Sequence, residues 1–240
     1  MERSVRIPNA ARHRAAGGGE DLAPRRGTGR TVRGRQSRRL LVDAARLVFE
    51  RDGFLRARVA DICEAAGTSH GSFYTYFTSK EEIFAEVVDS VEIDLLRLEP
   101  VSKSAGPVER IRAANRHYLE TYLENADILA VIQQVATFDA EVRATRLQRQ
   151  DEFARVIEKR IREYQDAGLA DTRLDAWTAA NALGGMVAFV ADQVATGRAT
   201  LTDDDVVEQL TVLWCNALGL RSGGSHPAKG VGGATPSRRR

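Results

Sequence analysis

The chain has 240 residues, of which 43% are hydrophobic and 28% charged, and six are prolines. This length and apolar content are enough for a hydrophobic core in one or two domains. No segment has the ~18 uncharged apolar residues of a membrane span. The arginines near the start are not followed by an apolar stretch, so we expect neither a membrane helix nor a secretory signal.

The formal net charge of +2 hides an uneven distribution. Residues 1–39 carry eleven arginines against three acidic residues, and residues 221–240 carry five basic residues and no acid, so residues 40–220 sum to −11. Basic ends attached to an acidic body suggest an electrostatic partner for those ends. Nucleic acid is the obvious polyanion.

Residues 1–36 combine glycines, two prolines and scattered arginines with hardly any periodic apolar residue. Such a segment cannot bury enough surface to offset the entropy of ordering it, so we expect a disordered basic arm. Two interpretations stay open. The arm is a solvated tail or the product of a misplaced start codon, or its last arginines, Arg33, Arg35, Arg38 and Arg39, contact DNA phosphates or enter the minor groove.

The next segment predicts three short helices. Ser37 is expected to cap a helix that runs to Asp52 and ends at Gly53. A second helix over residues 59–66 places apolar residues at i, i+3, i+4 and i+7, and Gly67 ends it with a left-handed residue. Ser69 then caps a third helix that reaches Phe77.

The third helix has one apolar face and one face suited to DNA. Phe73 and Phe77, four residues apart, are expected to dock on the second helix. The outward side chains are His70, Gly71, Ser72, Thr75 and Tyr76. A helix with short donors, a glycine and polar-tipped aromatic groups on its outer face can enter the major groove and reach base edges.

The residues Ala66–Phe77, AGTSHGSFYTYF, and Ser79–Phe84, SKEEIF, resemble the helix-turn-helix signature of the TetR (tetracycline repressor) family of bacterial regulators. The segment Leu41–Phe54 is similar to that family's first helix. The resemblance implies an all-α fold: a three-helix DNA-binding head over residues 37–80 and a larger helical ligand-binding and dimerisation domain over residues 81–220. Residues 221–240 are expected to form a disordered basic tail.

The resemblance also implies which residues contact DNA. We assign phosphate contacts to Arg38, Arg58, Tyr74, Lys80 and the backbone amide of Ser69, and base contacts to His70, Gly71, Ser72, Thr75 and Tyr76. Arg58 stands where the family usually has a threonine or serine that caps the second helix. The capping hydroxyl is lost there, and a guanidinium able to grip phosphate is gained.

The remaining chain predicts six more helices. Ser79 and Glu82 fit a capping box that opens a helix from Lys80 to about Leu98, long enough to connect the head with the second domain. After a loop over residues 100–107, helices are expected over residues 108–125, 126–137, 139–167, 172–196 and 203–219.

Two adjacent glycines inside one helix, Gly184 and Gly185, cost about 1 kcal/mol each relative to alanine, so we expect the close approach of another helix to compensate. In the resembled family the last two helices pair with their copies as a four-helix bundle. The residues assigned to this dimer interface are Ala180, Gly184, Val187, Ala188, Ala191, Leu210, Leu213, Trp214 and Ala217. The alternative is that both apolar faces are core of a single chain.

A cavity for an apolar or amphipathic small-molecule effector is expected between the helices of the second domain. The polar and aromatic residues that lie on its otherwise apolar segments are the candidates: His117, Tyr118, Tyr122, Gln133, Gln134, Phe138, Trp177 and Asn181. Each of them singly is more often a core or surface residue.

Nothing in the sequence indicates catalysis. The four histidines are dispersed, and no phosphate-cradling loop or nucleophile elbow is present, so we expect no catalytic residue, metal or cofactor. Cys63 and Cys215 are expected to be buried thiols of a cytoplasmic protein.

Together these features predict a dimeric, ligand-responsive transcriptional regulator in the bacterial cytoplasm, associated with the nucleoid. It would bind a pseudo-palindromic DNA operator, acting as a repressor that its effector releases. Two alternatives stay open: a small-molecule-binding helical protein that acts through protein partners, and a helical enzyme.

Overall fold

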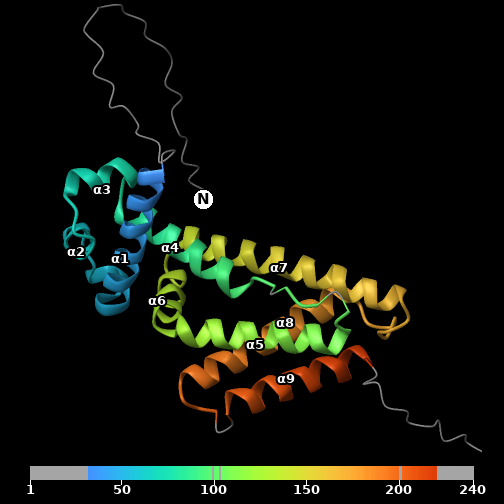
Figure 1. The fold of residues 1–240 in the computed structure, drawn as a ribbon. Coiled ribbons are helices and arrows are strands. Elements are labelled where there is room, and N and C mark those ends of the chain that lie inside the picture. Colours follow the sequence, from blue (N-terminus) through green and yellow to red (C-terminus); the bar gives the residue numbers. More distant parts are fainter. Residues whose placement is uncertain (1–31, 99, 103, 200–201, 221–240) are drawn as a thin grey trace, which may run out of the picture.

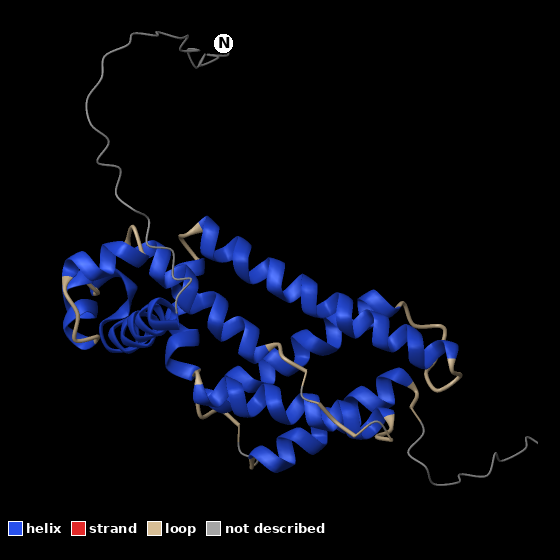
Figure 2. Cartoon of the chain, turned by 45° about the horizontal axis from the view of Figure 1, so that its top comes forward, coloured by secondary structure: helices blue, strands red, loops and turns tan. Residues whose placement is uncertain are grey.

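The computed structural model describes residues 32–220 apart from residues 99, 103, 200 and 201. These residues form helices joined by short loops, with no strand among them (Figures 1 and 2). The helices are α1 (Val32–Arg56), α2 (Val59–Ala65), α3 (His70–Tyr76), α4 (Lys80–Leu95), α5 (Pro107–Glu124), α6 (Ala126–Ala136), α7 (Ala140–Asp166), α8 (Ala176–Ala195) and α9 (Asp203–Leu218). The predicted all-α fold is confirmed. Within this part of the chain, no helix is long and apolar enough to cross a bilayer.

Helix α1 begins earlier than predicted. It starts at Val32, so Ser37 lies inside the helix instead of capping it, and residues 32–36 are helical. Arginine and glutamine are good helix formers, which lets the helix extend upstream of the serine. At the other end Gly53 breaks the helix with φ 72°, a left-handed conformation that favours glycine. The predicted arm and tail over residues 1–31 and 221–240 lie outside the described residues.

Helices α1 to α3 form the head at one end of the molecule (Figure 1). Its core contains Phe73 and Phe77 of the α3 segment, both fully buried as predicted. The ring of Phe84 on α4 meets Phe49 edge-on at 4.9 Å between centroids and Phe54 at 4.7 Å. The start of α4 therefore completes the core of the head, and α4 is joined rigidly to it.

The corner between α2 and α3 is built as predicted. Gly67 adopts φ 60°, and the N–H of Thr68 donates to the carbonyl of Cys63 at 2.9 Å. The hydroxyl of Ser69 accepts a hydrogen bond from the N–H of Ser72 at 3.2 Å, which caps α3. These local bonds fix the angle at which α3 leaves α2.

Helix α4 leads from the head into the body (Figure 1). The predicted cap is present, because the N–H of Glu82 donates to the hydroxyl of Ser79 at 3.2 Å. Further along, α4 is joined to α7 by two ion pairs: Arg149 Nε donates to Asp89 at 2.8 Å, and Arg146 Nε donates to Glu92 at 3.0 Å. Motion of α4 is thus coupled to α7 as well as to the head.

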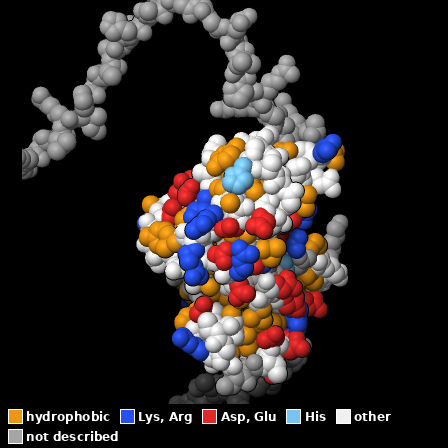
Figure 3. Space-filling model, turned by 90° about the vertical axis from the view of Figure 1, so that its left-hand side faces the viewer, with side chains coloured by type: hydrophobic (Ala, Val, Ile, Leu, Met, Phe, Trp, Pro, Cys, Tyr) orange, Lys and Arg blue, Asp and Glu red, His pale blue; other side chains and the backbone are white. Residues whose placement is uncertain are grey.

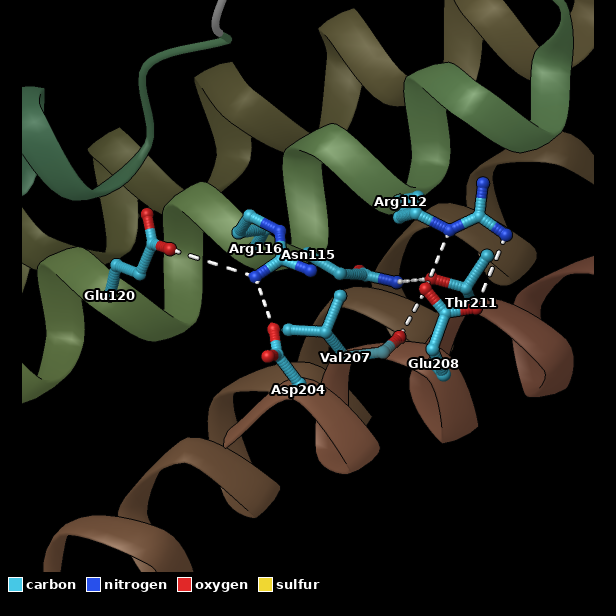
Figure 4. A network of polar contacts seen from close by, with 8 residues as sticks. All are labelled: Arg112, Asn115, Arg116, Glu120, Asp204, Val207, Glu208 and Thr211. Atoms are coloured by element: carbon cyan, nitrogen blue, oxygen red, sulfur yellow. Dashed lines mark hydrogen bonds and ion pairs between the residues drawn. The ribbon is translucent and has the colours of Figure 1, made fainter. Parts of the chain in front are cut away.

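In the body, α5 and α9 lie side by side and are connected by polar contacts (Figure 4). Arg112 Nε donates to Glu208 at 2.6 Å, and Arg116 Nη1 donates to Asp204 at 2.6 Å. Between them the buried amide of Asn115 donates to the hydroxyl of Thr211 at 3.3 Å. The three contacts repeat along both helices, so they set the register of α9 against α5.

Candidate DNA-binding surface and ligand cavity

Helix α3 presents an exposed ridge at the end of the head. Four residues at helical spacing, His70, Gly71, Tyr74 and Thr75, are exposed, and the side chain of Tyr74 is 57% accessible. Phe73 lies fully buried behind them. We call these four residues the recognition ridge. The backbone at Gly71 is open, which allows close approach to a groove.

Two of the predicted base-contacting residues are not part of the recognition ridge, because they are only partly exposed. Tyr76 is half-buried and packs against the core, and Ser72 is half-buried with its hydroxyl 3.1 Å from that of Ser69. The hydroxyl of Thr75 donates to the carbonyl of Gly71 at 3.0 Å, so its methyl group and remaining lone pair are available outward. The turn of 100° per residue brings Ser72 and Tyr76 toward the buried phenylalanines.

The structure assigns Arg38 a partner inside the protein. Its guanidinium makes a two-pronged ion pair with Glu86 of α4, with Nη2 donating to the carboxylate at 2.6 Å. It also lies over the ring of Phe77, 4.8 Å from the centroid. The sequence could not reveal this pairing. Arg38 therefore joins α1 to α4, and the phosphate contact assigned to it from the sequence stays a prediction.

Lys80 is likewise turned toward the head itself. Its ammonium donates to the carbonyl of Phe54 at 2.8 Å and to that of Ala57 at 3.1 Å, and it lies 4.5 Å from the centre of the Phe54 ring. These carbonyls end α1, where a cation is favoured by the helix dipole. In the described structure Lys80 binds these carbonyls, and the phosphate contact assigned to it from the sequence stays a prediction.

Arg58 retains the predicted position. It is exposed at the start of α2, where no side chain replaces the lost capping hydroxyl, although the carboxylate of Asp61 accepts from the Arg58 backbone N–H at 3.2 Å. The guanidinium thus remains at the surface. Figure 3 looks onto this end of the molecule, where basic and acidic side chains are interspersed and neutral and apolar ones surround the upper histidine. Contact with DNA here depends on placed residues more than on a uniformly basic face.

A cavity of about 330 Å³ runs through the body between α4, α5, α6, α7, α8 and α9. Its size falls in the usual range for small-molecule sites. Four of the eight residues predicted to line it do so: Tyr118, Tyr122, Gln133 and Asn181. The phenol of Tyr122 is held in place, because it donates to Asp192 at 3.3 Å and accepts from the amide of Gln133 at 3.3 Å.

The other four predicted residues lie elsewhere. His117 turns away from the cavity, with its ring Nε2 2.8 Å from the carbonyl of Asp94. Gln134, Phe138 and Trp177 are exposed on the outer surface. A polar or aromatic residue on an apolar helix does not by itself show which side of that helix faces the cavity.

The charged residues that line the cavity were not predicted from the sequence. Glu92, only 2% exposed, pairs with Arg146, and burial raises the pKa of its carboxyl despite that partner. Burial also raises the pKa of Tyr118, and the negative charge of Glu92 adds to the effect. Arg110 and Arg160 are further lining residues. The lining therefore combines an apolar wall with several charged groups.

The adjacent glycines of α8 open the cavity. A Cβ atom added at either Gly184 or Gly185 would meet no heavy atom of another part of the described chain within 4 Å. The predicted close approach of another helix is therefore absent within the described chain. Both glycines line the cavity, so their missing side chains leave space where a ligand can lie.

One polar atom in the cavity wall lacks a partner. Trp214 is 8% exposed and lines the cavity, and its indole nitrogen has no hydrogen-bond partner among the described residues. A buried donor of this kind costs free energy unless an acceptor reaches it.

The chain matches two family models. Residues 41–87 match "Bacterial regulatory proteins, tetR family", and residues 104–192 match "Tetracyclin repressor-like, C-terminal domain". The uncharacterised HTH-type transcriptional regulator YdgC of Bacillus subtilis is 28% identical over 170 residues, covering 67% of this chain and 82% of that protein.

This chain belongs to the TetR family. Two solved structures share its fold. FadR, a fatty acid degradation regulator from Bacillus halodurans, aligns with a TM-score of 0.65 at 19% identity over 77% of this chain and 97% of that one. A regulator from Pseudomonas aeruginosa aligns with a TM-score of 0.67 at 22% identity, over 81% and 94%. As a TetR-family protein the chain is a DNA-binding transcriptional regulator and not an enzyme.

Most of the residues predicted to form the dimer interface do not lie on the exposed face of α8 and α9. Five of the assigned residues are buried against the chain's own helices: Ala180, Val187, Ala191, Leu210 and Trp214. Gly184 and Ala188 line the cavity, and Leu213 and Ala217 are exposed. Helix α8 is apolar on both sides. Most of the residues assigned from the sequence lie on the side that faces the interior of the chain.

Leu213 is the one assigned residue among the large side chains in the apolar surface that α8 and α9 expose, and the others there were not assigned. Trp177 and Phe189 of α8 are 55% and 65% exposed, and Val212 and Leu213 of α9 are each 49% exposed. An apolar surface of this kind on two neighbouring helices is typical of an interaction site.

Proposed function

We propose that this TetR-family regulator is a homodimeric repressor that binds a pseudo-palindromic operator and leaves it when a small molecule enters the cavity. It would act in the cytoplasm, at the bacterial nucleoid. The observation that carries the proposal is the position of α4, since one helix both completes the head core through Phe84 and lines the cavity through Glu92 and Leu95.

The DNA-binding half of the proposal depends on the recognition ridge. Thr75 and His70 would face base edges, while Tyr74, Arg58 and the backbone amide at Ser69 would hold phosphates. Two copies of the ridge, set one DNA turn or roughly 34–36 Å apart, would read two half-sites.

The dimer would form through the exposed face of α8 and α9. A second copy placed there would cover Trp177, Phe189, Val212 and Leu213, and the contact would be isologous, with the same surface on each copy. Gly185 is exposed, so a partner helix would be able to approach this residue, as the glycine pair predicted.

Release would follow from a different affinity of the ligand for two head spacings. A ligand that fills the cavity best when α4 is displaced shifts the population toward the state with mismatched heads. The coupling is reciprocal, so operator DNA would weaken ligand binding by the same factor.

The experiment that tests this function is retention of sheared genomic DNA by the purified full chain, followed by sequencing and titration of a retained fragment. We expect one or a few fragments with an inverted repeat. Thr75→Ala should reduce the preference for that fragment over random DNA by about tenfold or more, because it removes a base contact. Arg58→Ala should weaken both about equally and lower the salt dependence by about one phosphate. Retention without sequence preference, in wild type, would contradict the proposal.

A further inference from the structure

Most of the polar side chains that line the cavity are already bonded within the chain. The phenol of Tyr122 donates to Asp192 and accepts from Gln133, and Arg146 Nε donates to one carboxylate oxygen of Glu92 at 3.0 Å. The other bonded side chains in the lining include those of Arg110, Asn115, Arg160 and Asn181. A ligand gains little from such groups, because it would have to break an existing contact to reach them.

The hydroxyl of Tyr118 has no such partner. Its ring lies beside that of Tyr122, with 6.1 Å between the centroids, and it lines the cavity, but its oxygen forms no hydrogen bond with a described residue. Among the buried and half-buried residues of the described chain, the indole nitrogen of Trp214 is the one unpaired side-chain polar atom that is closed off from water. The unpaired oxygen of Tyr118 is therefore open, and a molecule in the cavity can reach it.

A carboxylate lies near this phenol. Glu92 of α4 also lines the cavity, and its negative charge acts on Tyr118 of α5, adding to the rise that burial causes in the pKa of the phenol. Arg146 donates to one oxygen of the carboxylate, and no other described residue donates to Glu92. The second oxygen is thus able to accept. A phenolic O–H and a carboxylate oxygen together match a hydroxyl group, which can accept from the first and donate to the second.

The charges around Tyr118 are paired. Glu92 is opposed by Arg146, and Arg149, one turn further along α7, donates to Asp89 at 2.8 Å. A charged ligand group placed here would lose its hydration and find no unpaired opposite charge to compensate. A neutral hydroxyl loses far less, so this part of the cavity favours a neutral polar group.

A second phenol of the cavity lacks these surroundings. Tyr164 also lines the cavity and forms no hydrogen bond with a described residue. The charges that act on it most are those of Arg160 and Arg110, which oppose the rise that burial causes in the pKa of its phenol. Tyr164 therefore lacks the neighbouring acceptor that Glu92 provides for Tyr118, and it serves as a comparison for the role of that residue.

We infer that the effector is a neutral, largely apolar molecule with a hydroxyl group, which accepts a hydrogen bond from Tyr118 and donates one to Glu92. The inference rests on the proposed function in that it takes the cavity as the effector site. The hydroxyl would join α5 to α4, so the ligand would be bonded directly to the helix that completes the core of the head. A purely apolar ligand would leave both groups unpaired.

The test compares four probes that share a naphthalene ring, chosen because aromatic side chains line this part of the cavity. They are 1-(2-naphthyl)ethanol, the ketone 2-acetylnaphthalene, the cation 1-(2-naphthyl)ethylamine and the anion 2-naphthoate. Binding to the full chain is measured by calorimetry at pH 7 without DNA.

We expect the alcohol to bind at least about tenfold more tightly than either charged probe, because a charged group is costly to desolvate. The ketone can accept from Tyr118 but has no proton for Glu92, so it should bind several-fold more weakly than the alcohol. A charged probe or the ketone binding as tightly as the alcohol, or no binding of the alcohol, would overturn the inference.

The role of the phenol is tested by Tyr118→Phe, which keeps the ring and removes the hydroxyl. It should weaken the alcohol by about fivefold or more and leave the hydrocarbon 2-ethylnaphthalene unchanged within about twofold. The matched control is Tyr164→Phe, the same substitution at the other unpaired phenol of the cavity, which should change neither affinity. Equal losses of alcohol affinity in the two variants, or no loss in Tyr118→Phe, would refute the assigned hydrogen bond.

Failure of this inference can be told apart from failure of the proposed function. The ranking of the probes in wild type does not depend on the folding of any variant, and operator retention is measured separately without probes. A chain that selects its DNA fragment and yet does not favour the alcohol contradicts this inference alone. A chain that favours the alcohol but retains no DNA contradicts the proposed function alone.

Discussion

Arg46 of α1 donates from Nη1 to the side-chain oxygen of Asn125 at 2.6 Å, which ties the head directly to the corner between α5 and α6. The same guanidinium pairs with Glu50 at 2.8 Å, so it is held in place from its own helix. The ion pair between Arg38 and Glu86 makes a second connection, so the head is joined to the rest of the chain both at α4 and at the start of α6. The orientation of the recognition ridge therefore depends on both helices.

Removing the tie at α6 should loosen the head. In Arg46→Ala we expect operator affinity to fall several-fold, because a head that is free to reorient loses more conformational entropy when it binds DNA. Arg51→Ala is the matched control, since Arg51 is on the same helix and pairs with its neighbour Asp52. Both variants lose one positive charge. Fluorescence anisotropy with the retained fragment therefore separates the effect of losing the contact with Asn125 from the effect of losing a charge. Equal losses in the two would show that the contact does not orient the head.

Lys80 should act on stability more than on DNA binding. Replacement by methionine removes an ammonium that donates to the carbonyls of Phe54 and Ala57. We expect the free energy of unfolding to fall by about 1.5–3 kcal/mol, the range for hydrogen bonds to charged groups. Lys159→Met, at an exposed site of α7, should be close to neutral. Urea denaturation measures both. A variant of unchanged stability whose DNA affinity has a weaker salt dependence would restore the phosphate role.

Glu92 makes stability depend on pH in an unusual direction. Its pKa is raised by burial, so the folded chain binds the proton more tightly than the unfolded chain. Such a group contributes most below its ordinary pKa of 4.5, and that contribution is lost as the pH rises through the folded-state value. We therefore expect the free energy of unfolding of wild type, relative to Glu92→Gln, to decrease between pH 4.5 and 8. An increase over that interval would mean that attraction to Arg146 outweighs burial.

The elements that follow from neighbouring residues were predictable from the sequence. Gly67 and Ser69 end one helix and begin the next through bonds that span five residues or fewer, so their identities predict the corner. The pair Phe73 and Phe77 likewise lies within one helix and is buried as its spacing indicates. Ser37 failed as a cap because nothing local prevented α1 from starting earlier.

The partners of long side chains were not predictable in the same way. Arg38 meets Glu86 across 48 positions, and Arg146 meets Glu92 across 54. No spacing rule connects residues so far apart. The apolar face of α8 posed a related problem, since Ala180 faces inward and Phe189 outward on a helix that is apolar on both sides. Only the packing of the other helices decides between them.

Gly184 separates the two explanations for the glycine pair. A methyl group there meets no atom of the chain within 4 Å, so Gly184→Ala should raise the free energy of unfolding by about 0.5–1 kcal/mol through helix propensity. Gly184→Leu would place a larger side chain in the cavity, and we expect operator binding to persist while the affinity for a ligand that occupies the cavity falls at least about tenfold. Thermal unfolding and calorimetry measure the two effects. If alanine instead destabilised the dimer, a partner helix would have to approach Gly184 itself, and the glycine would serve the interface and not the cavity.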